Sequence, residues 1–227
     1  MLQDYLSSLK SLFPENAHTE LRGQHSRMRR VTLVSGNVMV NDRRDISGVS
    51  ARVYRGGVYG FSSMAEYSAE AARKVLRAAA ENANFMAAHA GRQTGALPMI
   101  QGAPILLEKD ISDPEQQRYL AFARKVDALI QSHCEKLIGR RVITTEDSME
   151  KLLVTSDGLT AHTVSPRSYC YIFMTAEARD GSPVEVFAAL GGEGTFDANF
   201  TDPNQTEAEI YRLYNSLMEK CEGVYAD

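Results

Sequence analysis

The stretch that decides the fold is residues 29–63, RRVTLVSGNVMVNDRRDISGVSARVYRGGVYGFSS. Its small apolar residues recur at every second position, in the runs Val31/Leu33, Val38/Val40, Val49/Ala51/Val53 and Val58/Gly60. Because side chains alternate between the two faces of a strand, each run predicts a strand with one apolar face. Gly36-Asn37 and Gly56-Gly57 stand where consecutive strands must reverse, and both pairs tolerate positive φ. The stretch predicts an antiparallel meander with helices on one face.

The composition is that of a globular protein with a substantial core: 227 residues, 44% of them hydrophobic. The 29 acidic and 25 basic residues give a net charge of -4, which weakly opposes binding to nucleic acid phosphates. No apolar run approaches the ~20 residues that cross a bilayer, and the first 13 residues lack the basic start of a signal peptide. Cytoplasmic localisation is therefore expected. The odd number of widely spaced cysteines favours buried or free thiols over a zinc or disulfide framework: Cys134, Cys170 and Cys221.

Helices are predicted on both sides of the meander. An amphipathic first helix carries one apolar stripe, Leu2, Tyr5, Leu6, Leu9 and Leu12, and a strand follows over Thr19–His25. Ser68 is a good N-cap for the next helix. The apolar stripe of that helix is rich in alanine, which predicts close approach to the sheet: Ala72, Val75, Leu76, Ala79, Ala83 and Met86. Residues 90–112 lack a pattern and are predicted to be a connector.

The second half repeats this order. Ser112-Asp113-Pro114-Glu115 predicts a helix start and Gly139 its end, with an apolar face at Tyr119, Phe122, Val126, Leu129, Ile130, His133 and Leu137. Five strands are then predicted, over 141–146, 150–155, 159–164, 168–178 and 184–190, with turns at Asp157-Gly158 and Asp180-Gly181. Gly191–Gly194 is predicted to break the sheet. A capping box at Thr206–Glu209 predicts the start of the last helix, which ends at Gly223.

These patterns predict an α+β fold, an antiparallel or mixed sheet meander with packing helices. The similarity of the halves suggests a duplicated α-β-α unit, with a first repeat at 1–89, a connector at 90–112 and a second repeat at 113–227. Ser35-Gly36-Asn37 and Ser156-Asp157-Gly158 are then equivalent turns. One sheet and two small sheets both remain open.

Three motifs resemble the N-terminal half of the TldD/PmbA family, whose members were called modulators of DNA gyrase and are understood as metallopeptidases. They are VTLVSGNV at 31–38, GVSARVYRGGVYGFSS at 48–63, and VTSDGL at 154–159 with GGEG at 191–194. The second motif is the most specific. The resemblance implies a zinc site in a later domain, built on a His-Glu-x-x-x-His helix.

That motif is absent from this sequence, in which the five histidines are His18, His25, His89, His133 and His162. The resemblance therefore implies a non-catalytic N-terminal domain that is inactive alone, with no catalytic or metal residues and no cofactor of its own. It would shape the peptide cleft and the subunit interface. The implied partners are the catalytic domain of the same parent protein, a second copy or a paralogue in a dimer, and a peptide substrate; a membrane is not expected and nucleic acid is disfavoured.

Four groups of residues have chemistry-bearing types. His133-Cys134-Glu135 offers ligand types, but neighbouring helical residues point about 100° apart and cannot converge on one ion. His18 and His25 could face each other across a strand pair. Ser156, Asp157 and His162 contain the types of a catalytic triad, although a tight turn explains the first two better. Gly191–Gly194 lacks the Gly-Lys-Ser/Thr of a phosphate loop, so a flexible connector is favoured.

Arginines are concentrated on the predicted meander: Arg22, Arg27, Arg29, Arg30, Arg43, Arg44, Arg52 and Arg55. A solvated sheet face is the simpler interpretation, and a groove for an anionic partner or a peptide carboxylate is the sharper one. Two classes of function remain open. The chain is either the non-catalytic half of a metallopeptidase or a stand-alone module that binds protein or nucleic acid through this sheet.

Overall fold

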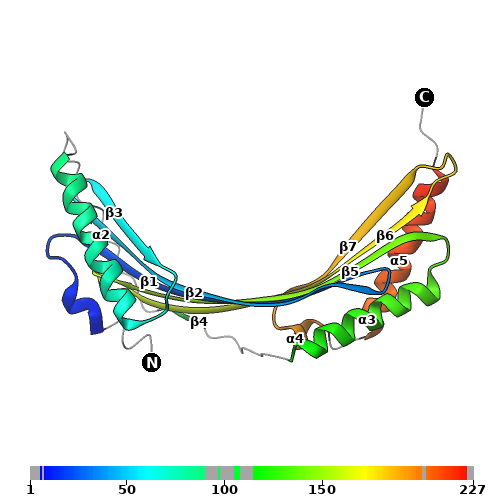
Figure 1. Ribbon diagram of the computed structural model, residues 1–227, viewed down its shortest axis with the longest axis horizontal. Coiled ribbons are helices and arrows are strands. Elements are labelled where there is room, and N and C mark those ends of the chain that lie inside the picture. Colours follow the sequence, from blue (N-terminus) through cyan, green and yellow to red (C-terminus); the bar gives the residue numbers. More distant parts are fainter. Residues whose placement is uncertain are drawn as a thin grey trace. The chain divides into compact units, whose positions relative to one another are not determined.

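The structure is a computed structural model that describes residues 6, 8–89, 97, 105–107, 115–200 and 203–223. Its strands form a seven-stranded sheet in the order β3-β2-β1-β5-β6-β4, with β7 pairing with β6 (Figure 1). The strands are β1 (His18–Val34), β2 (Asn37–Arg55), β3 (Val58–Met64), β4 (Ile105–Leu107), β5 (Leu137–Thr155), β6 (Thr160–Glu177) and β7 (Pro183–Glu193). The helices are η1 (Leu9–Leu12), α2 (Ala69–His89), α3 (Gln116–His133), α4 (Phe196–Asn199) and α5 (Pro203–Glu222). The α+β prediction is confirmed.

Four strands are much longer than predicted. The strand predicted at Thr19–His25 and the one beginning at Val31 are one strand, β1, and β2, β5 and β6 likewise join pairs of predicted strands. In β2 the residues from Asn41 to Ile46 are mostly polar and exposed, and they made one continuous strand look like two in the sequence. Where a strand has solvent on both sides, pairing needs no apolar residue at every second position, so the period disappears although the strand continues.

Contacts divide the chain into two compact units. Unit 1 comprises residues 1–26, 45–109 and 149–164, and unit 2 comprises 27–44, 110–148 and 165–227. Each unit collects three separate stretches of sequence, because the four long strands contribute residues to both, whereas the predicted repeats were continuous. The predicted equivalent turns do both lie between strands. The duplication itself stays a prediction.

In unit 1, α2 packs against the sheet through its alanine-rich stripe. A Cβ added at Gly60 of β3 would lie 2.1 Å from the carbonyl oxygen of Ala79, so the helix backbone rests directly on the strand. The core of the unit combines residues from helix and strands: Leu6, Leu9, Leu21, Val49, Ala51, Val53, Ala71, Ala72, Val75, Leu76, Ala79, Ala83, Leu152 and Val154. Ser68 caps α2 as predicted, since its hydroxyl accepts a hydrogen bond from the N–H of Ala71 at 3.1 Å.

In unit 2, α3 and α5 cover one face of the sheet. The largest buried side chains there come from both helices and from alternate positions of the strands: Val31, Leu33, Tyr119, Ile130, Ile172, Met174, Ile210 and Leu217. The three cysteines are free and buried in this core, in agreement with the prediction. Burial raises the pKa of Cys134 to about 11.

Turn chemistry was predicted well. Gly56 and Gly57 form the β2–β3 turn with φ of 58° and 86°, and Gly181, with φ of 83°, lies in the β6–β7 turn. The β1–β2 turn comes one residue earlier than predicted, at Ser35-Gly36, with φ of 47° and 81°. Asn37 is already in β2.

Several predicted helix boundaries are wrong. Helix α3 ends at His133, and Gly139 lies in β5, because Lys136 adopts a positive φ of 60° that redirects the chain into the strand. Helix α5 begins at Pro203, which suits a first helical position, so Thr206 is buried inside the helix instead of capping it. The predicted start at residues 112–114 lies outside the described residues.

Three smaller predictions also need correction. Met86 and Leu12 belong to the predicted stripes, yet they are 48% and 53% exposed, since both lie near the ends of their helices. Leu2 and Tyr5 lie outside the described residues. The predicted connector contains β4, which pairs in parallel with β6. Across the described residues, no helix combines the length and apolar character needed to cross a membrane.

Candidate functional site

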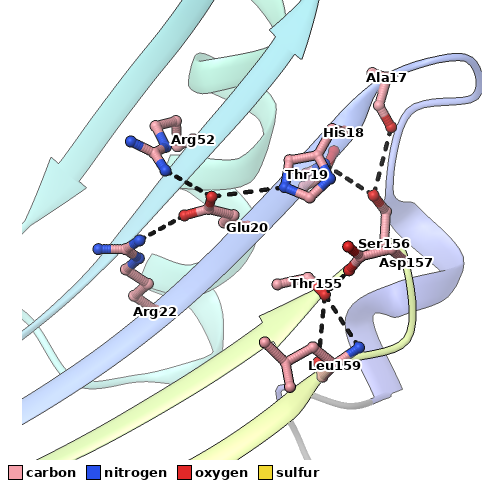
Figure 2. Close-up of polar contacts among 10 residues, drawn as sticks. All are labelled: Ala17, His18, Thr19, Glu20, Arg22, Arg52, Thr155, Ser156, Asp157 and Leu159. Atoms are coloured by element: carbon pink, nitrogen blue, oxygen red, sulfur yellow. Dashed lines mark hydrogen bonds and ion pairs between the residues drawn. The ribbon is translucent and has the colours of Figure 1, made fainter. Parts of the chain in front are cut away.

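A carboxylate held by two guanidinium groups is the most prominent polar cluster of unit 1. Glu20 of β1 accepts hydrogen bonds from Arg22 of the same strand and from Arg52 of β2, each at 2.6 Å (Figure 2). The period of two puts Glu20 and Arg22 on the face opposite Leu21, which points into the core. We call Glu20, Arg22 and Arg52 the carboxylate–arginine cluster.

Burial and charge act against each other on Glu20. Its side chain is only 12% exposed, so desolvation would raise the pKa, but the hydrogen bonds from Arg52 and Arg22 outweigh this effect and lower the pKa below 4.5. Arg52 also lies over the ring of Tyr59, 5.0 Å from its centroid. His18 approaches the same carboxylate with its Nε2 at 3.5 Å. The charges of Arg22 and Arg52 are therefore already paired with a carboxylate of the chain itself, Glu20.

The turn between β5 and β6 lies against the start of β1. The Ser156 hydroxyl accepts a hydrogen bond from the N–H of Thr19 at 2.9 Å, and the N–H of Ser156 donates to the carbonyl of Thr19 at 2.9 Å (Figure 2). The Thr155 hydroxyl donates to the Asp157 carboxylate, which lowers the pKa of that acid, and accepts from the N–H of Leu159 at 3.1 Å. Ser156 and Asp157 thus form a side-chain-bonded turn.

The residue types of a catalytic triad do not form a relay. His162 directs its Nε2 to Glu150 at 3.0 Å, while Ser156 and Asp157 bond to β1 and to Thr155. His18 and His25 lie on one strand, β1, so the predicted cross-strand arrangement is wrong. Within the described part of the chain, no group of three or more His, Cys, Asp or Glu residues is placed to hold a metal ion.

The arginines do not gather in one groove. Arg22, Arg52 and Arg55 belong to unit 1, and the other five belong to unit 2. Arg44 pairs with Asp42, Arg55 donates to Asn84 and to the carbonyl of Glu15, and Arg29 is buried. Because Arg22, Arg44, Arg52 and Arg55 already have partners, the sharper interpretation of an anion groove loses much of its support.

Unit 2 has a polar cluster of its own around a buried carboxylate. Glu146 of β5, 4% exposed, accepts a hydrogen bond from the N–H of Phe196 at 2.6 Å. Phe196 is the first residue of α4, where no helical carbonyl is available to the N–H. Burial is the largest effect on Glu146 and raises its pKa above 4.5, although the hydrogen bond from Phe196, the nearby Tyr119 side chain and the charge of Arg29 oppose that shift.

The remaining predicted groups have structural roles. His133 contacts the Tyr211 hydroxyl with its Nδ1 at 2.9 Å, and the carbonyl of Glu135 accepts from the Tyr214 hydroxyl at 2.9 Å, so this segment joins α3 to α5. Gly191 and Gly192 do not break the sheet. They pair with Tyr169 and Ser168 of β6, and a Cβ at Gly191 would lie 2.2 Å from the carbonyl oxygen of Ser168.

Sequence reasoning missed both buried glutamates, although a signal existed for each. Glu20 alternates with Arg22 along a strand, a spacing that puts opposite charges on one face. Glu146 lies four residues after Val142, a core residue of the same strand, so its position turns the acid toward the core. Neither signal identifies the partner, because Arg52 and Phe196 are brought close only by the fold.

Comparisons with known domain families match two stretches of the chain. Residues 19–83 match the domain described as PmbA/TldA metallopeptidase domain 1, and residues 109–213 match the PmbA/TldA metallopeptidase central domain. Together the two matches cover most of the 227 residues. A comparison with curated proteins gives no match.

Solved structures with the same fold agree with these matches. A candidate modulator of a DNA gyrase from Thermotoga maritima has a TM-score of 0.68 at 13% identity, over 96% of this chain and 48% of that one. TldE from Thermococcus kodakarensis gives 0.67 at 11%, over 96% and 47%. A candidate modulator of DNA gyrase from Bacteroides thetaiotaomicron gives 0.65 at 12%, over 93% and 49%. The chain thus spans about half the length of these proteins, and it belongs to the PmbA/TldD metallopeptidase family.

Proposed function

We propose that this chain acts as the non-catalytic N-terminal part of a PmbA/TldD-type metallopeptidase. In this role it forms a wall of the peptide cleft and contributes to the subunit interface. Peptide hydrolysis would take place on a zinc-bearing His-Glu-x-x-x-His domain that this sequence does not contain. Units 1 and 2 would position the peptide substrate and the partner subunit but would take no part in the chemical reaction.

The observation that carries the proposal is the pair of domain matches. The matched domains are the first and the central one of a metallopeptidase, and the solved relatives continue for about as many residues again. The polar clusters support a scaffolding role. Glu20 and Glu146 bond to groups of the chain itself, and the described contacts leave neither as a free general base.

A role at an interface is supported by the sheet face of unit 2 that α3 and α5 do not cover. Phe173 and Phe187 stack across β6 and β7 with ring centroids 5.6 Å apart, and Phe187 is 64% exposed. Arg141 lies 4.0 Å from the centroid of the Phe173 ring. Apolar rings exposed in this way are typical of surfaces that pack against another domain or subunit.

Two measurements on the 227-residue chain test the proposal. Elemental analysis of protein purified without chelator is expected to find less than one zinc per chain, and a fluorescent casein assay is expected to find no hydrolysis. Stoichiometric zinc bound through residues of this chain, or zinc-dependent cleavage, would contradict the assignment as non-catalytic.

A third measurement tests the interface. Light scattering at rising protein concentration is expected to show self-association, since this face would be covered in the assembled enzyme. The variant Phe187→Ser is expected to reduce the association, while Ile138→Ser, at a residue of β5 that is 59% exposed, serves as the control. A strict monomer at every concentration would count against the interface role.

A further inference from the structure

The outer edge of β3 has unused hydrogen-bonding capacity. β3 is the last strand in the sheet order, and in the described part of the chain no strand pairs with its far side. The strand is joined to β2 by the two-residue turn Gly56-Gly57, in which both φ angles are positive, as in a type I′ turn. This turn fixes which residues of β3 bond to β2 and which face outward.

Residues alternate between the two edges of the strand. Arg55 pairs with Val58 directly beside the turn, so Val58, Gly60 and Ser62 exchange hydrogen bonds with β2. Tyr59, Phe61 and Ser63 then point their N–H and C=O groups away from β2. A contact from α2 agrees with this assignment: the Asn82 side chain donates to the carbonyl of Phe61 at 2.9 Å, which requires that carbonyl to point outward.

Nothing in the sequence of β3 protects this edge. Natural edge strands are commonly blocked by lysine, other charged residues or proline, and VYGFSSM contains none of them. Apolar side chains flank the edge as well. Tyr59 and Phe61 are 44% and 57% exposed on the sheet face opposite α2, and Met86 is 48% exposed near the end of the helix that packs on β3.

We infer that the outer edge of β3 binds an extended polypeptide segment, which adds to the sheet as a further strand. The N–H and C=O groups of Tyr59, Phe61 and Ser63 would bond to its main chain. Its side chains would alternate between the uncovered face, near Tyr59 and Phe61, and the helix side, near Met86. This inference rests on the proposed role in a peptide cleft and assigns that role to one edge.

Among the described contacts of β3, the Asn82 side chain occupies the outward carbonyl of Phe61. In an added strand, a main-chain N–H would donate to this carbonyl in place of Asn82. The side-chain amide of Asn82 therefore stands in for the missing strand while the edge is unoccupied. The described contacts of the outward N–H groups of Tyr59, Phe61 and Ser63 include no such substitute. The carbonyls of an extended chain are spaced to accept from these outward N–H groups.

The test uses the ¹⁵N-labelled 227-residue chain and a peptide as long as β3, in which threonine and valine alternate. Saturable amide shifts are expected at Tyr59, Phe61 and Ser63. The same peptide methylated on its valine nitrogens is expected to bind at least about tenfold more weakly, because it loses main-chain donors. Equal binding of both peptides, or no shift at β3, would overturn the inference.

Two variants sharpen the result. Ser63→Pro removes an outward N–H and leaves the inner ladder intact, so it is expected to cause a similar loss of binding, whereas Ser63→Ala retains wild-type binding. The methylated peptide keeps the test valid if the proline variant does not fold. Pairing of β3 with a second copy of itself, seen as shifts that depend on protein concentration alone, would also overturn the inference. Failure here would leave the zinc and hydrolysis results, and hence the proposed function, unchanged.

Discussion

Among the described residues, each unit buries one glutamate, and the two are stabilised in opposite ways. Glu20 in unit 1 is held by two guanidinium groups, and its pKa is lowered. Glu146 in unit 2 is held by a backbone N–H without a cationic hydrogen-bond partner, and burial raises its pKa. The comparison shows that burial alone does not set the charge of an acid; the type of hydrogen-bond donor does.

Removing each side chain beyond Cβ gives the largest expected effects. Glu146→Ala is expected to lower the free energy of unfolding by about 3 kcal/mol, because it leaves the N–H of Phe196 buried without an acceptor and opens a cavity. Glu20→Ala is expected to cost less, about 2 kcal/mol, since Arg22 and Arg52 are 53% and 42% exposed and can turn to water. Urea unfolding at pH 7 measures both, and a larger loss for Glu20→Ala would reverse the ranking.

Isosteric amides separate charge from hydrogen bonding. Glu20→Gln is expected to destabilise the chain by about 1 kcal/mol at pH 7, because two guanidinium groups lose their anion. Glu146→Gln keeps an acceptor for Phe196 and removes a buried charge, so it is expected to be neutral or slightly stabilising. Chemical denaturation of both variants beside wild type provides the measurement. Equal losses at the two positions would mean that the local donors do not control these acids.

The two acids also predict opposite pH dependence. The folded pKa of Glu20 is lowered, so its stabilising contribution is fully present above the ordinary value of 4.5 and is lost as the pH falls through the folded pKa. The folded pKa of Glu146 is raised, so ionisation costs stability as the pH rises from about 4.5 through the folded pKa. A glutamine cannot ionise, so each glutamine variant lacks the pH-dependent contribution of its own site to the free energy of unfolding.

Unfolding curves between pH 3.5 and 7 are the measurement, with each glutamine variant as the control for its own site. The advantage of wild type over Glu20→Gln is expected to shrink below about pH 4.5, and the relative stability of Glu146→Gln is expected to grow above that pH. Parallel curves for wild type and either variant would show that the folded pKa of that acid is not shifted.

The same comparison shows what sequence could and could not predict. The β2–β3 turn and the cap at Ser68 depend on residues within a few positions of each other, and the sequence predicted both. The partners of the two glutamates are set by contacts over long separations, 32 residues for Glu20 and Arg52 and 50 for Glu146 and Phe196. Periodicity carries no information on such pairs. It also misleads where a strand is solvated on both faces, as between Asn41 and Ile46 of β2.

The family resemblance supplied what local patterns could not. Motifs at 31–38, 48–63 and 154–159 pointed to the family that the domain matches confirm. Their strands, β1, β2, β3 and β5, all belong to the one sheet. A family resemblance of this kind predicts the fold, whereas the contacts of Glu20 and Glu146 are known only from the structure.

Removal of a helix cap is expected to have a modest effect on stability, and it tests how far Glu146 supports α4. Ser68→Ala is expected to cost about 1 kcal/mol, because the N-terminus of the 21-residue α2 loses its acceptor for Ala71. Thr195→Ala removes a similar bond, to the N–H of Ala198 at 3.3 Å, from the four-residue α4. Its cost is expected to be about half as large, since Glu146 holds the N–H of Phe196 in the same turn.

The Glu146→Ala variant provides the decisive control for this last prediction. If Glu146 and Thr195 share the task of holding the first turn of α4, Thr195→Ala costs more in the Glu146→Ala background than in wild type, and the two effects are not additive. Ser68 lies in unit 1, whereas Glu146 and Thr195 lie in unit 2, so Ser68→Ala is expected to cost the same in every background. Thermal or urea unfolding of the single and double variants measures these differences. Additive effects of Thr195→Ala and Glu146→Ala would mean that the buried carboxylate serves the core around Tyr119 and contributes little to α4.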